Sequence, residues 1–120
     1  MNPVERMKKF VCLIQSFSLM FCDLSKPFNP PLGETYQARI GNGNYFAEQI
    51  CHHPPISAFI FEGKGYLLSG SMELTASIGP NSALGLFVGD LRLHFNDGMV
   101  FTGRLPGGQF SGFMVGSQKF

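Results

Sequence analysis

The segment EQICHHPPISA, residues 48–58, lies where two strand-like apolar stretches meet. His52 and His53 are followed at once by Pro54 and Pro55, in a chain that has only three histidines. The proline rings fix their own φ angles and push the preceding residue toward an extended conformation. We therefore expect the two imidazoles to be presented from a stiff segment. Because histidine can be cationic or neutral near pH 7, such a pair is a candidate phosphate-binding site.

Short apolar strands, separated by glycine-rich connections, extend from this segment toward both ends of the chain. Strands are predicted at residues 34–40, 45–51, 56–61, 66–77, 84–95, 99–105 and 110–115. The connections suit antiparallel pairing, and Asp97-Gly98 is the strongest hairpin signal among them. The apolar alternation between Leu86 and Phe95 is shifted once near Gly89, as a β-bulge would shift it.

The chain is expected to begin with a helical segment, residues 1–24, followed by a proline-rich loop and the antiparallel strands in residues 25–120. Met7, Val11 and Ile14 lie at helical spacing, which predicts a largely buried helix. Three aromatic residues adjoin this stripe: Phe10, Phe17 and Phe21.

A secretory signal peptide is the alternative interpretation of this N-terminal region, because basic residues precede an apolar run at 10–22. Polar residues interrupt the run, and no small-residue cleavage site follows it convincingly. The run is also too short to span a bilayer as a helix. These features favour the buried helix.

Composition limits the class of protein and its partners. Hydrophobic residues make up 44% of the chain and charged residues only 14%, which is low for a freely soluble small domain. The net charge is +1 with scattered basic residues, so no nucleic-acid partner is expected. The cysteines (Cys12, Cys22 and Cys51) show no metal spacing and no even disulfide set, which favours a reduced, cytosolic compartment.

A meander of twisted antiparallel strands this rich in glycine tends to curl toward a barrel. A barrel wall with an apolar interior can enclose one lipid-sized ligand. With 120 residues, the chain has the length of one domain. The predicted fold is therefore mainly β, with an N-terminal helix and an antiparallel sheet that curves.

Two motifs give the chain a specific resemblance. The segment EQICHHPPISA, together with KPFNPPLGETY at residues 26–36, resembles two conserved blocks of the oxysterol-binding protein family of lipid-transfer proteins. The resemblance implies an incomplete β-barrel around a hydrophobic tunnel, with helices that plug and cap it. Because that domain is several times longer, residues 1–120 resemble a part of it, a partial antiparallel barrel wall.

The resemblance also implies a ligand site. His52 and His53 match the family's pair that contacts the phosphate of phosphatidylinositol 4-phosphate, and Lys26 and Asn29 match residues that bind the same headgroup. A phosphomonoester carries nearly two negative charges and several strong acceptors. Lysine supplies a point charge, protonated imidazoles supply charge-assisted donors, and an amide donates without adding charge.

Some positions depart from the family pattern or take a supporting role. Cys51 stands where the family usually has serine or threonine, and Pro31 stands where it usually has leucine. Glu34, Glu48 and Gln49 are expected to make hydrogen bonds that support the fold. Further headgroup contacts belong to a C-terminal part of the family domain that no segment here matches.

The expected function is non-enzymatic lipid binding and transfer without a cofactor. By resemblance, a sterol or a phospholipid occupies an apolar tunnel in exchange for phosphatidylinositol 4-phosphate, at the surface of membranes that the cytosolic protein contacts peripherally. Sterol and phosphatidylserine both remain open as the second ligand. The alternative is a lipid-sensing or scaffold fragment without transfer activity.

Other chemistries for the histidine segment are disfavoured. A zinc site of Cys51, His52 and His53 would need convergent ligands, whereas adjacent side chains on a strand point to opposite faces, and no fourth ligand is evident. A Cys51–His52 nucleophilic pair meets the same objection. The plainer alternative is that both histidines only satisfy hydrogen bonds of their loop.

Overall fold

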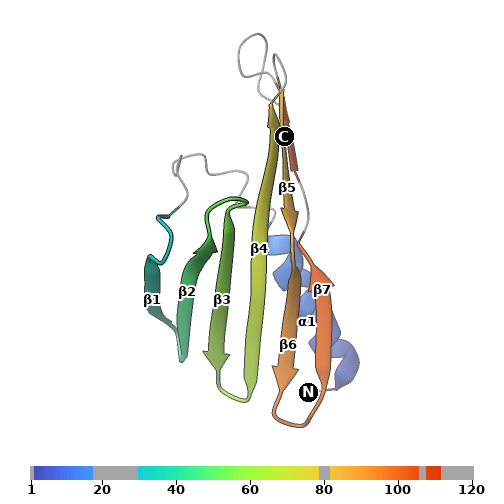
Figure 1. Ribbon diagram of the computed structural model, residues 1–120. Helices are drawn as coiled ribbons and strands as arrows, with labels where there is room; N and C mark the ends of the chain where they lie inside the picture. The colour runs from blue at the N-terminus through green and yellow to red at the C-terminus, as the bar shows by residue number, and fades with distance from the viewer. Residues whose placement is uncertain (1, 18–29, 79–81, 106–107, 112–120) are drawn as a thin grey trace.

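The computed structural model describes residues 2–17, 30–78, 82–105 and 108–111. A single helix precedes the strands among these residues, and the elements follow one another along the chain as α1 (Pro3–Ser16), β1 (Thr35–Ile40), β2 (Gly43–Cys51), β3 (Ile56–Gly63), β4 (Tyr66–Ile78), β5 (Ser82–Val88), β6 (Asp90–Phe95), β7 (Val100–Arg104) and β8 (Gly108–Ser111). Figure 1 shows the strands side by side in one sheet, with α1 behind β6 and β7.

The sheet is antiparallel and open. Strands β1, β2, β3 and β4 form a meander, and the far edge of the long β4 pairs first with β6 and then with β5. Strand β7 continues the sheet from β6, and β8 continues it from β5. In the described part of the chain β1 and β7 each pair on one side only, so the sheet does not close. The expected mainly-β fold with a partial barrel wall is confirmed.

The predicted strand at 84–95 is divided at Gly89, but the expected bulge is wrong. Val88 lies opposite Glu73 and Leu91 lies opposite Gly70, so the steps from 88 to 91 and from 73 to 70 match and no residue is inserted. Glycine is required at this point, since a Cβ at position 89 would overlap the carbonyl oxygen of Ser71 on β4. Val88 is simply an apolar residue on the exposed face of the sheet.

The hairpin predicted at Asp97-Gly98 is present between β6 and β7. Gly98 has a φ of 85°, a left-handed conformation that glycine adopts without steric cost. Its amide donates to the carbonyl of Phe95 at 3.0 Å, and the amide of Met99 donates to the carboxylate of Asp97 at 3.3 Å. The local sequence therefore determines this turn.

Two capping residues define the start of helix α1. Asn2 is the N-cap and its side chain accepts a hydrogen bond from the amide of Glu5 at 2.9 Å, while Pro3 occupies the first helical position. The helix has 14 residues. Within the described residues, no helix combines the length and the apolar character needed to cross a membrane.

The predicted buried stripe of this helix is partly wrong. Met7 and Val11 are 44% and 55% exposed, and Phe10 is the buried residue of α1. Phe10, Leu13, Ile14 and Phe17 face the sheet, spaced at i, i+3, i+4 and i+7. Because α1 lies on the surface, only one narrow face of it contacts the strands, and neighbouring apolar positions remain in solvent. Phe21 lies outside the described residues.

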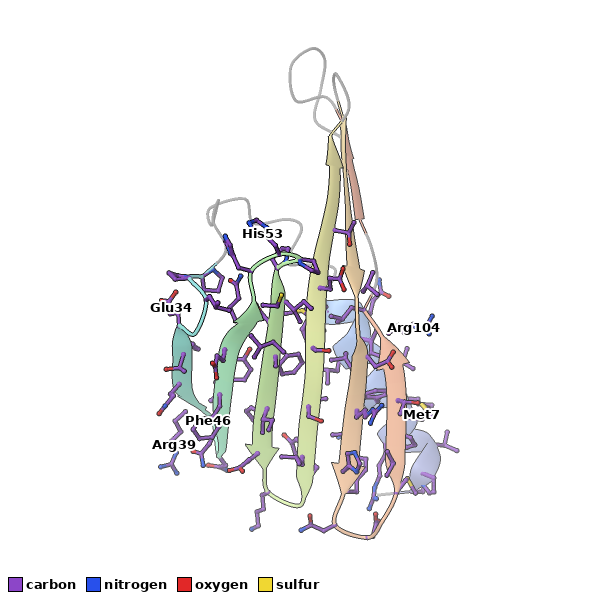
Figure 2. The ribbon with its side chains drawn as sticks, viewed as in Figure 1. Met7, Glu34, Arg39, Phe46, His53 and Arg104 are labelled. Carbon is purple, nitrogen blue, oxygen red and sulfur yellow. The ribbon has the colours of Figure 1, made fainter. Side chains whose placement is uncertain are left out.

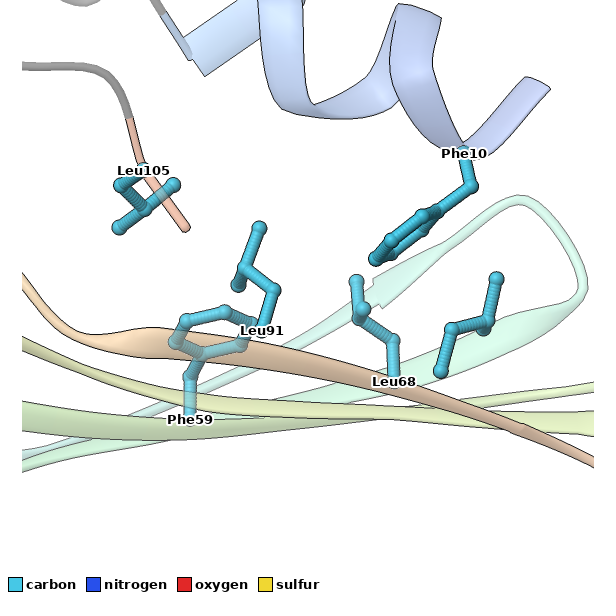
Figure 3. Packing of buried hydrophobic residues seen from close by; sticks show 6 residues of the cluster. Phe10, Phe59, Leu68, Leu91 and Leu105 are labelled. Carbon is cyan, nitrogen blue, oxygen red and sulfur yellow. The ribbon is translucent and has the colours of Figure 1, made fainter. Parts of the chain in front are cut away.

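The hydrophobic core lies between α1 and the sheet (Figure 3). Phe10 points from the helix toward Leu68, and Leu91 has no exposed surface. The buried apolar residues are Phe10, Phe59, Leu68, Leu91, Leu93 and Leu105. The strand members come from alternate positions on the covered face, as the period of a strand requires.

A polar contact holds the start of α1 to the β6–β7 hairpin. The Arg6 side chain forms an ion pair with Asp97, and its guanidinium lies 4.5 Å from the ring centroid of Phe95. The hydrogen bond from Arg6, supported by one from the amide of Met99, lowers the pKa of the Asp97 carboxyl. The hairpin turn thus also positions the helix.

Candidate functional site: a histidine turn and an apolar groove

The histidine pair lies in the turn between β2 and β3. Residues 52–55 form this turn, and the peptide bond between His53 and Pro54 is cis. Figure 2 shows His53 at one end of the sheet, with Phe46 toward the opposite end of β2. Both histidines are exposed, and the centroids of their rings are 4.4 Å apart. The turn therefore presents two adjacent imidazoles to solvent.

The rings of His52 and His53 are not held apart, as the disfavouring of a zinc site had assumed. His52 and His53 follow the end of β2 and do not belong to the strand, so the alternation of strand side chains does not separate their rings. Across the residues that the structure describes, no group of three or more histidine, cysteine or acidic side chains is arranged to hold a metal ion.

Gln49 connects the turn to the rest of the sheet. Its side chain is 1% exposed, and its Nε2 donates to the backbone carbonyl of Cys51 at 3.0 Å. The same nitrogen lies 3.4 Å from Nδ1 of His52. The thiol of Cys51 donates to the carbonyl of His53 at 3.4 Å. Gln49 thus supports the fold as expected, and it does so directly beneath the histidine pair.

The backbone of Gln49 also holds the end of the upstream motif. The amide of Gly33 donates to the carbonyl of Gln49 at 2.9 Å, and the amide of Gln49 donates to the carbonyl of Glu34 at 3.4 Å. The side chains of Glu34 and Glu48 are exposed. The two sequence motifs therefore meet at Gln49, although residues 37–47 separate them in the chain.

Two of the four predicted headgroup residues, Lys26 and Asn29, lie outside the described residues. Their placement beside His52 and His53 stays a prediction.

An apolar groove lies between α1 and the sheet, with a volume of about 880 Å³. That volume falls in the range of small-molecule sites, which is roughly 300–1,000 Å³. Aromatic and aliphatic side chains form most of its lining, and Arg6, Lys9 and Lys64 also contribute. The apolar lining residues are Phe10, Leu13, Phe17, Tyr45, Phe59, Phe61, Tyr66, Leu68, Met72, Leu93 and Phe95.

Sequence reasoning did not identify these groove residues. The alternation of Phe59 and Phe61 on β3 was a usable signal, but only the strand register shows that Phe61 lies opposite Tyr45 on the same face. Burial raises the pKa of the Tyr45 hydroxyl, with a smaller contribution from Tyr36, whose ring centroid is 6.1 Å away. The phenol of Tyr45 therefore stays neutral, and the positive charges of the groove come from Arg6, Lys9 and Lys64.

Comparison with known proteins gives consistent results. The family described as "Oxysterol-binding protein" matches residues 1–120. Oxysterol-binding protein 9 of Dictyostelium discoideum is 37% identical over 106 residues, which cover 84% of this chain and 25% of that protein.

Two solved structures have a similar fold. The first is the Osh3 ORD from Saccharomyces cerevisiae in complex with PI(4)P, with a TM-score of 0.71 and 28% identity over 79% of this chain and 26% of that one. The second is the Osh1 ORD domain in complex with cholesterol, with a TM-score of 0.70 and 29% identity over 79% and 24% of the two chains. This chain thus spans about a quarter of these three relatives. From the family match over its whole length, the chain belongs to the oxysterol-binding protein family.

Proposed function

We propose that the protein binds a lipid and transfers it between membranes without catalysing a covalent reaction. The apolar groove between α1 and the sheet receives the lipid's hydrophobic part, and the histidine turn recognises the phosphate of phosphatidylinositol 4-phosphate. The observation that carries this proposal is the pairing of two exposed, adjacent imidazoles with an apolar groove on one sheet. Similar proteins solved with PI(4)P and with cholesterol support both halves of it.

The physical basis differs between the two parts of the lipid. Removing apolar surface from water contributes roughly 25 cal/mol per Å², which supplies the energy for extracting a sterol or an acyl chain from a membrane. Charge-assisted hydrogen bonds to a phosphate contribute less energy but depend on the chemistry of the headgroup. The groove therefore provides affinity, and the turn selects phosphatidylinositol 4-phosphate over lipids that lack its phosphate.

By the same proposal, Lys26 and Asn29 add a positive charge and a neutral donor to this headgroup site, and the protein contacts membranes peripherally. No cofactor takes part. The support is the match of the segment at residues 26–36 to the family motif, and the contact of Gly33 and Glu34 with Gln49.

The test is a transfer assay between vesicles, one population carrying phosphatidylinositol 4-phosphate and the other carrying sterol. The variant His52→Ala/His53→Ala should lose at least about tenfold in headgroup affinity per histidine, because a hydrogen bond to a charged group is worth roughly 1.5–3 kcal/mol. His94→Ala is the matched control, since His94 is an exposed histidine on β6, away from the turn. Equal activity in both variants would refute the proposed site.

The second candidate function is headgroup sensing without transfer. Tyr36 and Ile40 share the groove's face of the sheet but are 62% and 56% exposed, so the apolar surface continues beyond the part that α1 covers. An open apolar face of this kind suits binding at a membrane surface better than carrying a lipid through water. Binding to vesicles with phosphatidylinositol 4-phosphate, but no movement of either lipid, would favour this function.

A further inference from the structure

The side-chain amide of Gln49 donates hydrogen bonds through its nitrogen, whereas its oxygen has no hydrogen-bond partner among the described residues. Its Nε2 lies 3.0 Å from the carbonyl oxygen of Cys51 and 3.4 Å from Nδ1 of His52. Its Oε1 is buried and accepts no hydrogen bond in the described part of the structure. The contacts of the NH₂ group therefore account for the position of the amide.

The chemistry of the neighbours fixes the orientation of this amide. A backbone carbonyl can only accept a hydrogen bond, so the nitrogen end must face Cys51, and a reversed amide would set two acceptors against each other. The NH₂ group has two hydrogens, and the second is available to His52. A donor facing Nδ1 requires that Nδ1 accept, and a neutral imidazole then carries its proton on Nε2.

We propose that Gln49 is a positioning residue for His52: it selects the Nε2–H tautomer and orients the ring so that this N–H is offered to a phosphate. The phosphate part of the statement rests on the proposed function, whereas the tautomer part rests on the geometry of the turn alone. No hydrogen bond from the described residues reaches the ring of His53, so the effect is specific to one member of the pair.

The first measurement is nitrogen-15 NMR of the imidazole nitrogens at alkaline pH, where free imidazoles are neutral. In the native protein His52 should be the Nε2–H tautomer. In Gln49→Met it should become a mixture, while His53 and His94 keep their native signals as internal references. An Nδ1–H tautomer of His52 in the native protein, or an unchanged ratio in the variant, would overturn the proposal.

Gln49→Met is chosen because it keeps an unbranched side chain of similar length and leaves the backbone bonds to Gly33 and Glu34 in place. It removes the donor and the unpaired acceptor together, which limits the cost to folding. If the variant does not fold, a hydrogen-bond scalar coupling between the Gln49 amide and Nδ1 of His52 in the native protein decides the matter. An observed coupling supports the proposal, and its absence overturns it.

The second measurement is binding to phosphatidylcholine vesicles that contain phosphatidylinositol 4-phosphate. Gln49→Met should weaken binding about 2- to 12-fold, the value of one ordinary hydrogen bond, and less than His52→Ala does. In the His52→Ala background it should have no further effect, since its role passes through that ring. If the losses of vesicle affinity in Gln49→Met and His52→Ala add up in the double variant, Gln49 has only a structural role. If the native protein does not bind these vesicles, the proposed function is refuted, and the tautomer measurement still tests the role of Gln49 independently.

Discussion

The two halves of the sheet differ in what covers the face that bears the groove. Under α1, residues of β4 and β6 such as Leu68, Leu91 and Leu93 are buried. At the other edge, Tyr36 and Ile40 on β1 face the same side and remain more than half exposed. Because buried apolar surface stabilises a fold, the covered half carries most of the stability, and through Leu68 and Leu93 it also lines the groove. The open half extends the exposed apolar surface beyond the groove, where it is available for contacts.

Truncating one side chain in each half tests this division most directly. Leu91→Ala should lower the free energy of unfolding by about 2–5 kcal/mol, because it removes a fully buried side chain and leaves a cavity. Ile40→Ala, which removes a similar side chain from the open half, should change it by about 0.5 kcal/mol or less. Urea denaturation measures both values, and equal losses would contradict the division into two halves.

Two glycines on the covered side of the sheet test which neighbours can move. Gly89→Ala should cost about 1–3 kcal/mol or more, since its Cβ would meet the backbone carbonyl of Ser71 and the strands would have to shift. Gly103→Ala should cost less, because its Cβ would meet the end of the Ile14 side chain, which can move. The urea midpoints show which variant loses more stability. A larger loss for Gly103→Ala would show that α1 yields less than the strands around Gly89.

The smallest expected effect concerns the contact between Arg6 and Asp97. The pKa of Asp97 is lowered in the folded protein, so its ionised form stabilises the fold above the ordinary value of 3.8, and this contribution is lost as the pH falls through the lowered pKa. Native protein and Asp97→Asn should therefore differ in melting temperature at neutral pH and converge in acid. Asp97 is exposed, so added salt should also reduce the difference. A difference in melting temperature that persists in acid would show that Asp97→Asn acts through the hairpin turn and not through the ion pair with Arg6.

Local signals predicted much of the fold and part of the site. The strands were found within a few residues because the turns that bound them contain glycine, asparagine and proline, which act over a few positions. The same is true of the turn that presents His52 and His53, since two consecutive prolines restrict the backbone locally. The errors at Gly89 and in the buried stripe of α1 concern how segments lie against one another. The histidine rings were expected on opposite faces because His52 and His53 were treated as strand residues, whereas they lie in the turn.

Local sequence was enough to predict the approximate positions of most strands, the hairpin at Asp97-Gly98 and an imidazole pair at a proline-stiffened connection, because each of these depends on residues close together in the chain. The identity of the groove-lining side chains, and the link that Gln49 makes between the upstream motif and His52, emerge only in the folded protein. Those contacts depend on strand register and on the packing of α1, which bring together residues that are distant in the chain.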